Sequence, residues 1–327
     1  MTRVRRPVST MVTALLAMAT LAGCGLSSGG TVPFNVGPGS IRPVAALKGV
    51  PITIGSKDFT ENILLGYIAE YALQAAGANV RDMTDIQGSN SGRQALRSGQ
   101  IDMYWEYTGT AWISYQGNTN PIADSQQMFN AVKAADAKLG IDWVDLAPMN
   151  DTYAIAESQQ VRQKYGVTNV SQLAALANRD PSVATFCLES EFASRNDGFP
   201  GLQQKYGMHV PNSHIQILDT GAVYAATAQA KACNFGEIFS TDARTRYLHL
   251  TVLDDDKKFF PSYAAAVTIR HSVLQQHPEV AQVLEPVAQR LTNQQIIDMS
   301  YQVDVQGRDW ADVAKDWMVK QGFVSPP

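Results

Sequence analysis

The alternation of short strands with helices constrains the fold of this chain more than any other feature. Strands and helices are expected in turn at 51–57, 61–76, 80–86, 93–97 and 101–104. Thr60 is the expected N-cap of the first helix, and Gly77 ends it. This order of elements predicts an α/β fold in which a mostly parallel sheet is flanked by helices.

The same alternation restarts in the second half of the chain. Helices are expected at 128–139, 171–177, 202–206 and 221–231, and strands at 183–188, 215–218, 235–239 and 264–269. Residues 278–323 are helical, with Val280, Val283, Leu284, Val287 and Leu291 forming one apolar stripe. We therefore expect two lobes between which the chain crosses more than once: lobe I from 49–149 and 258–327, and lobe II from 150–257. Ligands of such proteins bind in the cleft between the lobes.

The first 23 residues are expected to be a signal peptide and not part of the fold. Arg3, Arg5 and Arg6 precede an apolar stretch that is too short to span a bilayer comfortably. The stretch runs into Leu-Ala-Gly-Cys24, which resembles the lipobox of bacterial lipoproteins and implies a lipid on Cys24. The alternative is an ordinary secretory signal with an incidental cysteine. Residues 24–48 are rich in Gly, Ser and Pro and are expected to be a flexible tether.

Charge and cysteine content restrict the environment and the partners. Without the three signal arginines the chain has 23 basic and 30 acidic residues, which argues against nucleic-acid binding. Cys187 and Cys233 form an even pair in an exported chain and are therefore candidates for a disulfide. Two buried free thiols are the alternative, because the sequence does not show how close their Cα atoms lie.

Motifs of enzyme chemistry were not found. The chain has no GxGxxG after a strand, no GxxxxGK[ST], no GxSxG and no HExxH. We therefore expect neither an enzyme nor a metal or cofactor site. A lipid-anchored, two-lobed α/β chain is instead the construction of the solute receptors of bacterial ABC importers.

Aromatic residues and a glycine turn lie at the end of the third expected strand, in Ile101-Asp-Met-Tyr-Trp-Glu-Tyr-Thr-Gly-Thr110. Open α/β sheets bind ligands at this end of their strands. Aromatic faces attract a cation that has no N–H donors, because the ring quadrupole needs no hydrogen bond. Tyr104 and Trp105 point to opposite faces of the strand and are expected to pack or to line the rim of the cleft.

Five segments together resemble one protein family. They are Gly-Ser-Lys57-Asp-Phe-Thr-Glu, the 101–110 segment, Asn-Asp-Thr-Tyr153-Ala, Phe239-Ser-Thr-Asp, and Asp-Asp-Lys-Lys-Phe-Phe-Pro261. In this order they resemble the substrate-binding proteins of glycine betaine/choline/carnitine ABC importers (ProX/OpuC type), from about residue 50 to the C-terminus. The resemblance implies a Venus-flytrap receptor that holds a trimethylammonium group in a cage of tyrosines.

The resemblance also implies the site residues. The cage positions fall on Tyr107, Tyr153, Phe239 and Tyr263. Phe239 departs from the tyrosine that is usual in the family: it keeps the ring face and loses the hydroxyl. The remaining pocket positions fall on Lys57, Thr110, Asp151 and Arg195, of which Lys57 and Arg195 suit the carboxylate of a betaine. Taken singly, Tyr107, Tyr153 and Tyr263 are also explained as half-buried strand residues. Lys57 is also explained as a solvated lysine at a strand end, Arg195 as a salt-bridge partner of Asp197 or Glu191, and Phe239 as a buried core residue.

We thus predict a monomeric, lipid-anchored receptor on the outer face of the cell membrane that passes a quaternary ammonium osmolyte to an ABC permease. One alternative is the same fold with a pocket that has changed to a non-quaternary ligand, since Phe239 departs from the family. Another is a surface lipoprotein enzyme or adhesin on a receptor fold, which no sequence feature favours.

Overall fold

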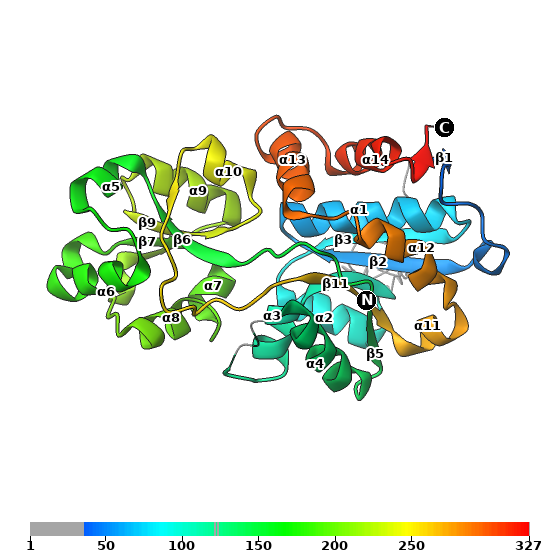
Figure 1. The fold of residues 1–327 in the computed structure, drawn as a ribbon, viewed down its shortest axis with the longest axis horizontal. Coiled ribbons are helices and arrows are strands. Elements are labelled where there is room, and N and C mark those ends of the chain that lie inside the picture. Colours follow the sequence, from blue (N-terminus) through cyan, green and yellow to red (C-terminus); the bar gives the residue numbers. More distant parts are fainter. Residues whose placement is uncertain (1–35, 121, 123, 327) are drawn as a thin grey trace, which may run out of the picture.

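Two five-stranded sheets form the centres of the two lobes in the computed structural model, which describes residues 36–120, 122 and 124–326 (Figure 1). The sheet of lobe I has the order β3-β2-β4-β11-β5, and that of lobe II the order β10-β6-β9-β7-β8. The strands are β1 Gly37–Pro38, β2 Pro51–Lys57, β3 Asn79–Ile86, β4 Met103–Tyr107, β5 Ile141–Val144, β6 Tyr153–Glu157, β7 Phe186–Leu188, β8 Ile215–Ile217, β9 Phe235–Phe239, β10 Thr251–Val252, β11 Ala265–Arg270 and β12 Val324–Ser325. The lobe boundaries at residues 150 and 258 stay predictions.

Each sheet is mixed instead of mostly parallel. In lobe I, β2 runs parallel to β3 and β4, whereas β11 is antiparallel to both β4 and β5. In lobe II, β7 runs parallel to β8 and β9, whereas β6 is antiparallel to both β9 and β10. The antiparallel strands β6 and β11 are those by which the chain enters lobe II and returns to lobe I, so their direction is set by the crossing and not by a strand–helix–strand unit.

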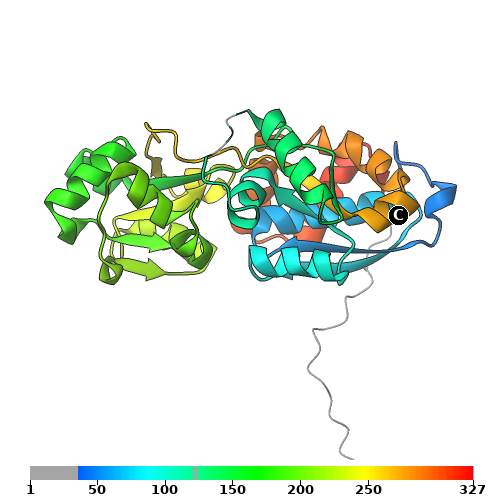
Figure 2. The ribbon, with the colours of Figure 1, turned by 90° about the horizontal axis from the view of Figure 1, so that it is seen from below.

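Helices cover both faces of the two sheets (Figures 1 and 2). The helices of lobe I are α1 Thr60–Ala75, α2 Ser89–Ser98, α3 Thr108–Thr110, α4 Ser125–Ala137, α11 His271–Gln276, α12 Glu279–Ala288, α13 Asn293–Asp304 and α14 Trp310–Lys320. Those of lobe II are α5 Gln159–Tyr165, α6 Val170–Arg179, α7 Ser190–Ser194, α8 Phe199–Tyr206, α9 Thr220–Gln229 and α10 Ala243–Tyr247. Short turns of other helix types lie at Ala45–Leu47, Ala111–Tyr115, Pro181–Val183 and Asn212–His214. Helices α12, α13 and α14 pack on α1, so the helical C-terminal part completes lobe I.

The start of α1 differs from the expectation. Phe59, with extended backbone angles, is the N-cap, and Thr60 is the first helical residue. The Thr60 hydroxyl donates to Asp304 Oδ1 of α13 at 2.7 Å instead of capping the helix. This leaves the ring of Phe59 at the carboxyl end of β2.

The predicted tether over 24–48 is wrong for its described part. Residues 37 and 38 pair with 325 and 324, Leu47 is fully buried, and Ile41 donates its amide hydrogen to Phe323. A Cβ on Gly39 would lie 2.6 Å from the Gly322 carbonyl oxygen, so glycine permits this close approach. Residues 36–48 are therefore part of lobe I. The predicted signal peptide and Cys24 lie outside the described residues.

Two segments cross between the lobes side by side, as Figure 1 shows. Asn150 on the outward segment pairs with Ala264 on the return segment in an antiparallel bridge. The Asn150 side chain also accepts the amide hydrogen of Tyr263 at 2.6 Å. These bonds hold Asp151 and Tyr263 beside each other at the entrance to lobe II.

Cys187 and Cys233 are joined by a disulfide, with their Cα atoms 5.6 Å apart. Cys187 lies in β7, and Cys233 lies two residues before β9, which is the neighbouring strand. Across the described ranges, no helix combines the length and apolar character that crossing a membrane requires.

Candidate ligand-binding cleft

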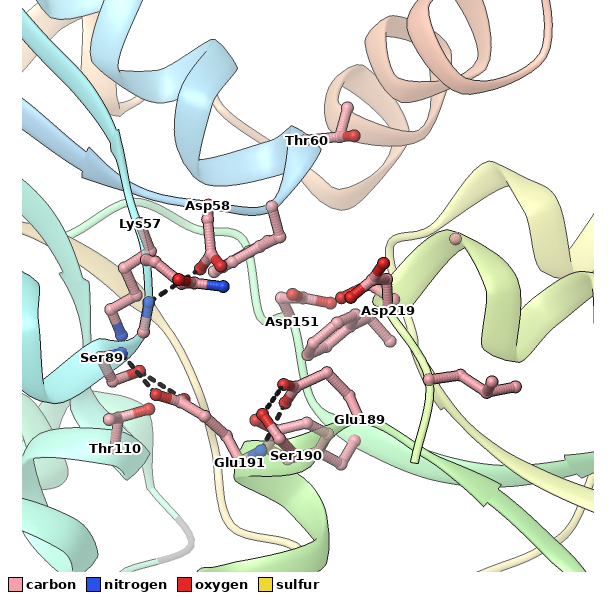
Figure 3. A pocket seen from close by; sticks show the side chains of 18 of the residues that line it. Lys57, Asp58, Thr60, Ser89, Thr110, Asp151, Glu189, Ser190, Glu191 and Asp219 are labelled. Atoms are coloured by element: carbon pink, nitrogen blue, oxygen red, sulfur yellow. Dashed lines mark hydrogen bonds between the residues drawn. The ribbon is translucent and has the colours of Figure 1, made fainter. Parts of the chain in front are cut away.

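All eight residues predicted to contact the ligand line one cavity of about 850 Å³ between the lobes. They come from both lobes and from the crossing segments: Lys57, Tyr107, Thr110, Asp151, Tyr153, Arg195, Phe239 and Tyr263. Tyr104 and Trp105, which were expected to pack or to line the rim, are fully buried and are not among the described residues that line the cavity. Figure 3 shows the side chains of part of the cavity lining and labels several of its polar residues.

Strand ends position the four rings of the predicted cage. Tyr107 is the last residue of β4, Tyr153 the first of β6, and Phe239 the last of β9. Tyr153 and Phe239 are direct partners in the antiparallel β6–β9 ladder, so their side chains share a face of the sheet. Tyr263 lies on the return segment two residues before β11. Residues up to 156 positions apart therefore meet at one place.

The rings form a continuous wall. Ring centroids are 5.0 Å apart for Tyr153 and Phe239, and 5.3 Å apart for Tyr153 and Tyr263, which meet edge to face. Phe59 also lines the cavity, stacks on Phe239 at 5.4 Å and lies 5.7 Å from Tyr107. Phe59 was not predicted as a site residue, although its segment was part of the resemblance. The cavity thus has five aromatic rings among its described lining residues.

The hydroxyls of two tyrosines of the predicted cage donate to carboxyl groups that are not among the described residues lining the cavity. Tyr107 donates to Glu61 at 2.7 Å, and Tyr263 donates to Asp197 at 2.7 Å. Both acceptors are buried carboxyl groups. These hydrogen bonds fix the orientation of the two rings. The rings therefore present their faces and edges to the cavity, and their hydroxyl donors are used elsewhere. Such a surface suits a group that cannot accept or donate hydrogen bonds.

The two basic residues that are predicted to bind a ligand carboxylate, Lys57 and Arg195, already have acidic partners in the protein. Lys57 Nζ lies 2.5 Å from Glu106 Oε1 and 5.1 Å from the centre of the Tyr107 ring. Arg195 donates from Nε to Asp197 Oδ1 at 2.8 Å, and its Nη2 also contacts Asp197 and, at 3.3 Å, the Thr110 hydroxyl. The cleft therefore brings Lys57 and Arg195 to the same cavity, with their charges paired within the protein.

A buried pair of carboxyl groups joins the lobes beside the cage. The Thr241 hydroxyl oxygen lies 2.5 Å from Glu61 Oε2 and 2.5 Å from Asp151 Oδ1. One hydroxyl has one hydrogen to donate, so one of the two carboxyl groups must be protonated and donate to Thr241. Burial and the neighbouring acids raise the pKa of Glu61, and burial raises the pKa of Asp151 to about 7, which agrees with a shared proton.

Direct hydrogen bonds across the cleft were also not predicted. Glu191 of α7 accepts from the Ser89 amide and, at 2.7 Å, from the Ser89 hydroxyl, at the first turn of α2 in lobe I (Figure 3). Glu191 also forms an ion pair with Arg195, at 3.2 Å. No local pattern indicates that a glutamate after β7 reaches the other lobe.

The buried carboxyl groups predict that the protein is more stable in mild acid than at pH 8. Burial raises the pKa of Asp151 and Glu157 to about 7 and that of Glu237 to about 8. The folded protein then holds protons that the unfolded chain releases above its pKa values of about 4. The free energy of unfolding therefore falls as the pH rises from about 4 to about 8 and is level above. We expect a melting temperature at least about 5 °C lower at pH 8 than at pH 5.5.

Thermal melts at constant ionic strength measure this effect. In Glu237→Gln the dependence should be weaker, because the glutamine side chain does not titrate. Its carbonyl oxygen can still accept from the Glu189 backbone N–H, whose nitrogen lies 2.6 Å from Glu237 Oε2 in the wild type. A melting temperature that rises between pH 5.5 and pH 8 would contradict the assignment.

Two lobes around an aromatic cavity define an extracytoplasmic solute-binding protein of the two-lobed class. Residues 50–320 match the family described as the substrate binding domain of the ABC-type glycine betaine transport system. The chain belongs to this family, which confirms the resemblance read from the sequence. It is a non-enzymatic binding protein for quaternary ammonium compounds that works with an ABC importer.

Three similar proteins illustrate the relation. The chain is 34% identical to a glycine-betaine-binding protein of Pseudomonas aeruginosa, over 82% of this chain and 86% of that protein. It is 31% identical to the ergothioneine transport permease/binding protein EgtU of Helicobacter pylori, over 86% of this chain and 49% of that protein. The solved structure of apo YehZ from Escherichia coli has a TM-score of 0.61 at 29% identity, covering 84% of this chain and 99% of that chain.

Proposed function

We propose that this protein is a lipid-anchored receptor that holds the trimethylammonium group of its ligand in the cage of Tyr107, Tyr153, Phe239, Tyr263 and Phe59. The lobes close on the bound ligand, and both lobes then contact the permease. Lys57, Thr110, Asp151 and Arg195 surround the other end of the ligand. The protein acts as a monomer, held at the membrane by the lipid on Cys24.

The observation that carries the proposal is the contiguous wall of five rings in a single cleft cavity. Each cation–π contact in a desolvated site contributes about 2 kcal/mol. After the costs of association, three or four such contacts support micromolar binding, about −8 kcal/mol. The rings come from both lobes and from the crossing segment, so a cation among them favours the closed arrangement.

Isothermal titration calorimetry of the full chain in an uncharged detergent tests the binding function. The titrants are choline, glycine betaine, carnitine, ergothioneine and tetramethylammonium. Injection of each titrant into buffer without protein is the blank. We expect micromolar binding of at least one quaternary compound. Absence of heat with all of them, from protein that melts cooperatively, would overturn the cage proposal.

The lipid anchor is tested separately in cells. The wild-type chain should fractionate with membranes and be released from them when Cys24 is replaced by serine. If Cys24→Ser stays in the membrane fraction, the anchor lies elsewhere and the ligand proposal is unaffected.

A further inference from the structure

A carboxylate of the protein itself occupies an anion site beside the cage. Glu191 Oε2 accepts from the Ser89 hydroxyl at 2.7 Å, Oε1 accepts from the Ser89 amide, and Arg195 Nη1 lies 3.2 Å from Oε2. Arg195 also lies over the Tyr153 ring, 5.9 Å from its centre. The Glu191 carboxylate, which accepts from these three donors, is therefore next to the proposed position of the ammonium group.

The donors of this site are those that would recognise a ligand carboxylate. A serine hydroxyl, an amide at the start of the ten-residue helix α2 and a guanidinium together form a strong anion site. Burial disfavours the charged form of Glu191, but Lys57, Ser89 and Arg195 outweigh this and lower its pKa, so the side chain is ionised at neutral pH. The site thus already holds a full negative charge.

The other cations of the cavity are not free either. Lys57 pairs with Glu106, Arg195 with Asp197, and Arg244 with Asp242. Among the described residues that line the cavity, three are basic and six are acidic: Lys57, Arg195 and Arg244 against Asp58, Asp85, Asp151, Glu189, Glu191 and Asp219. A ligand carboxylate would enter a cavity with more acidic than basic side chains, in which each basic side chain already has an acidic partner.

We infer that Glu191 is a specificity-determining residue that takes the place of a ligand carboxylate, so that the receptor prefers quaternary ammonium compounds with a net positive charge, such as choline, to zwitterionic betaines. The inference rests on the proposed function and names its ligand class. A bound cation gains the attraction of Glu191 in addition to the ring faces. A zwitterion must either displace Glu191 from Ser89 or hold its carboxylate close to it, and each alternative costs binding energy.

The test compares the choline and glycine betaine dissociation constants of the wild type and of Glu191→Gln by calorimetry. The wild type should bind choline at least about tenfold more tightly than glycine betaine. Glu191→Gln keeps the size of the side chain and an acceptor for Ser89 but removes the charge. It should weaken choline binding and strengthen glycine betaine binding, so that their affinity ratio falls at least about tenfold.

Asp316→Asn is the control, because Asp316 is an acid that is 57% exposed and is not among the described residues that line the cavity. It should change the ratio by less than about threefold. A wild type that prefers glycine betaine would overturn the inference. So would an unchanged ratio in Glu191→Gln, which would mean that Glu191 only holds the lobes together and affects both ligands equally. If neither compound nor tetramethylammonium binds, the proposed function fails instead.

Discussion

Replacing Tyr153 by alanine is expected to weaken binding of the quaternary ammonium ligand by about 30- to 1000-fold. Tyr153 lies at the centre of the aromatic wall, in contact with Phe239, Tyr263 and Phe192 at centroid distances of 5.0, 5.3 and 4.9 Å. Its loss removes one desolvated cation–π contact, worth about 2 kcal/mol, and leaves its neighbours unsupported. Each 1.4 kcal/mol is a tenfold change in the dissociation constant. Calorimetry with the tightest ligand of the wild type measures the effect.

Two variants separate the ring from the fold. Tyr153→Phe keeps the ring face and should bind within about threefold of the wild type. Tyr247→Ala removes a tyrosine that is 55% exposed and does not line the cavity among the described residues, so it should bind normally. Wild-type affinity in Tyr153→Ala would exclude the cage. If Tyr153→Ala also has a lower melting temperature, its dissociation constant is compared with that of the wild type at a temperature where both proteins are fully folded.

The position of the proposed cage residues in one cavity was predictable, because each lies in a segment with a local signature. Tyr107, Tyr153 and Phe239 end or begin strands, and the segments around them carry the family resemblance. Phe59 was missed because the sequence placed the helix N-cap at Thr60. In the structure the cap is one residue earlier, and this places the Phe59 ring at the end of β2, facing Phe239 of the other lobe.

Contacts between the lobes were less predictable. The hydrogen bonds between Ser89 and Glu191 and between Thr241 and Glu61 join residues that are 102 and 180 positions apart. Serine, threonine and glutamate are also common on a solvated surface. The neighbouring sequence therefore does not distinguish residues that bridge the lobes from surface residues. Their partners depend on how far the cleft is closed, which is a property of the assembled lobes.

The sheet order shows the same limit. The strand–helix alternation correctly indicated two α/β lobes, and each lobe has parallel pairs where strands follow one another through a helix. It did not indicate that β11 returns between β4 and β5, because strand patterns carry no information on direction. Likewise, a segment rich in glycine and proline has no periodicity whether it is free or, as at residues 37–41, paired with the C-terminal strand.

Replacing Asp136 by alanine is expected to lower the free energy of unfolding by about 3–5 kcal/mol. Asp136 of α4 is fully buried and accepts two hydrogen bonds of 2.7 Å from Arg93 of α2. It also accepts from the Trp143 indole of β5 at 2.7 Å and from Gln116 at 3.0 Å. The alanine variant leaves a buried guanidinium without its counter-charge and an indole N–H without its acceptor, and both are costly. Urea unfolding followed by circular dichroism measures the loss.

A surface pair provides the matched control, since Arg308 and Asp316 form an ion pair at 2.6 Å with side chains that are 36% and 57% exposed. Asp316→Ala should cost at most about 1 kcal/mol, because water already screens this pair. The double variant Arg93→Met/Asp136→Leu removes both buried charges together, so it should be more stable than Asp136→Ala alone. If the double variant is instead the less stable of the two, the loss in Asp136→Ala comes from packing. A cost for Asp136→Ala no larger than that of Asp316→Ala would show that the buried pair does not hold α2, α4 and β5 together.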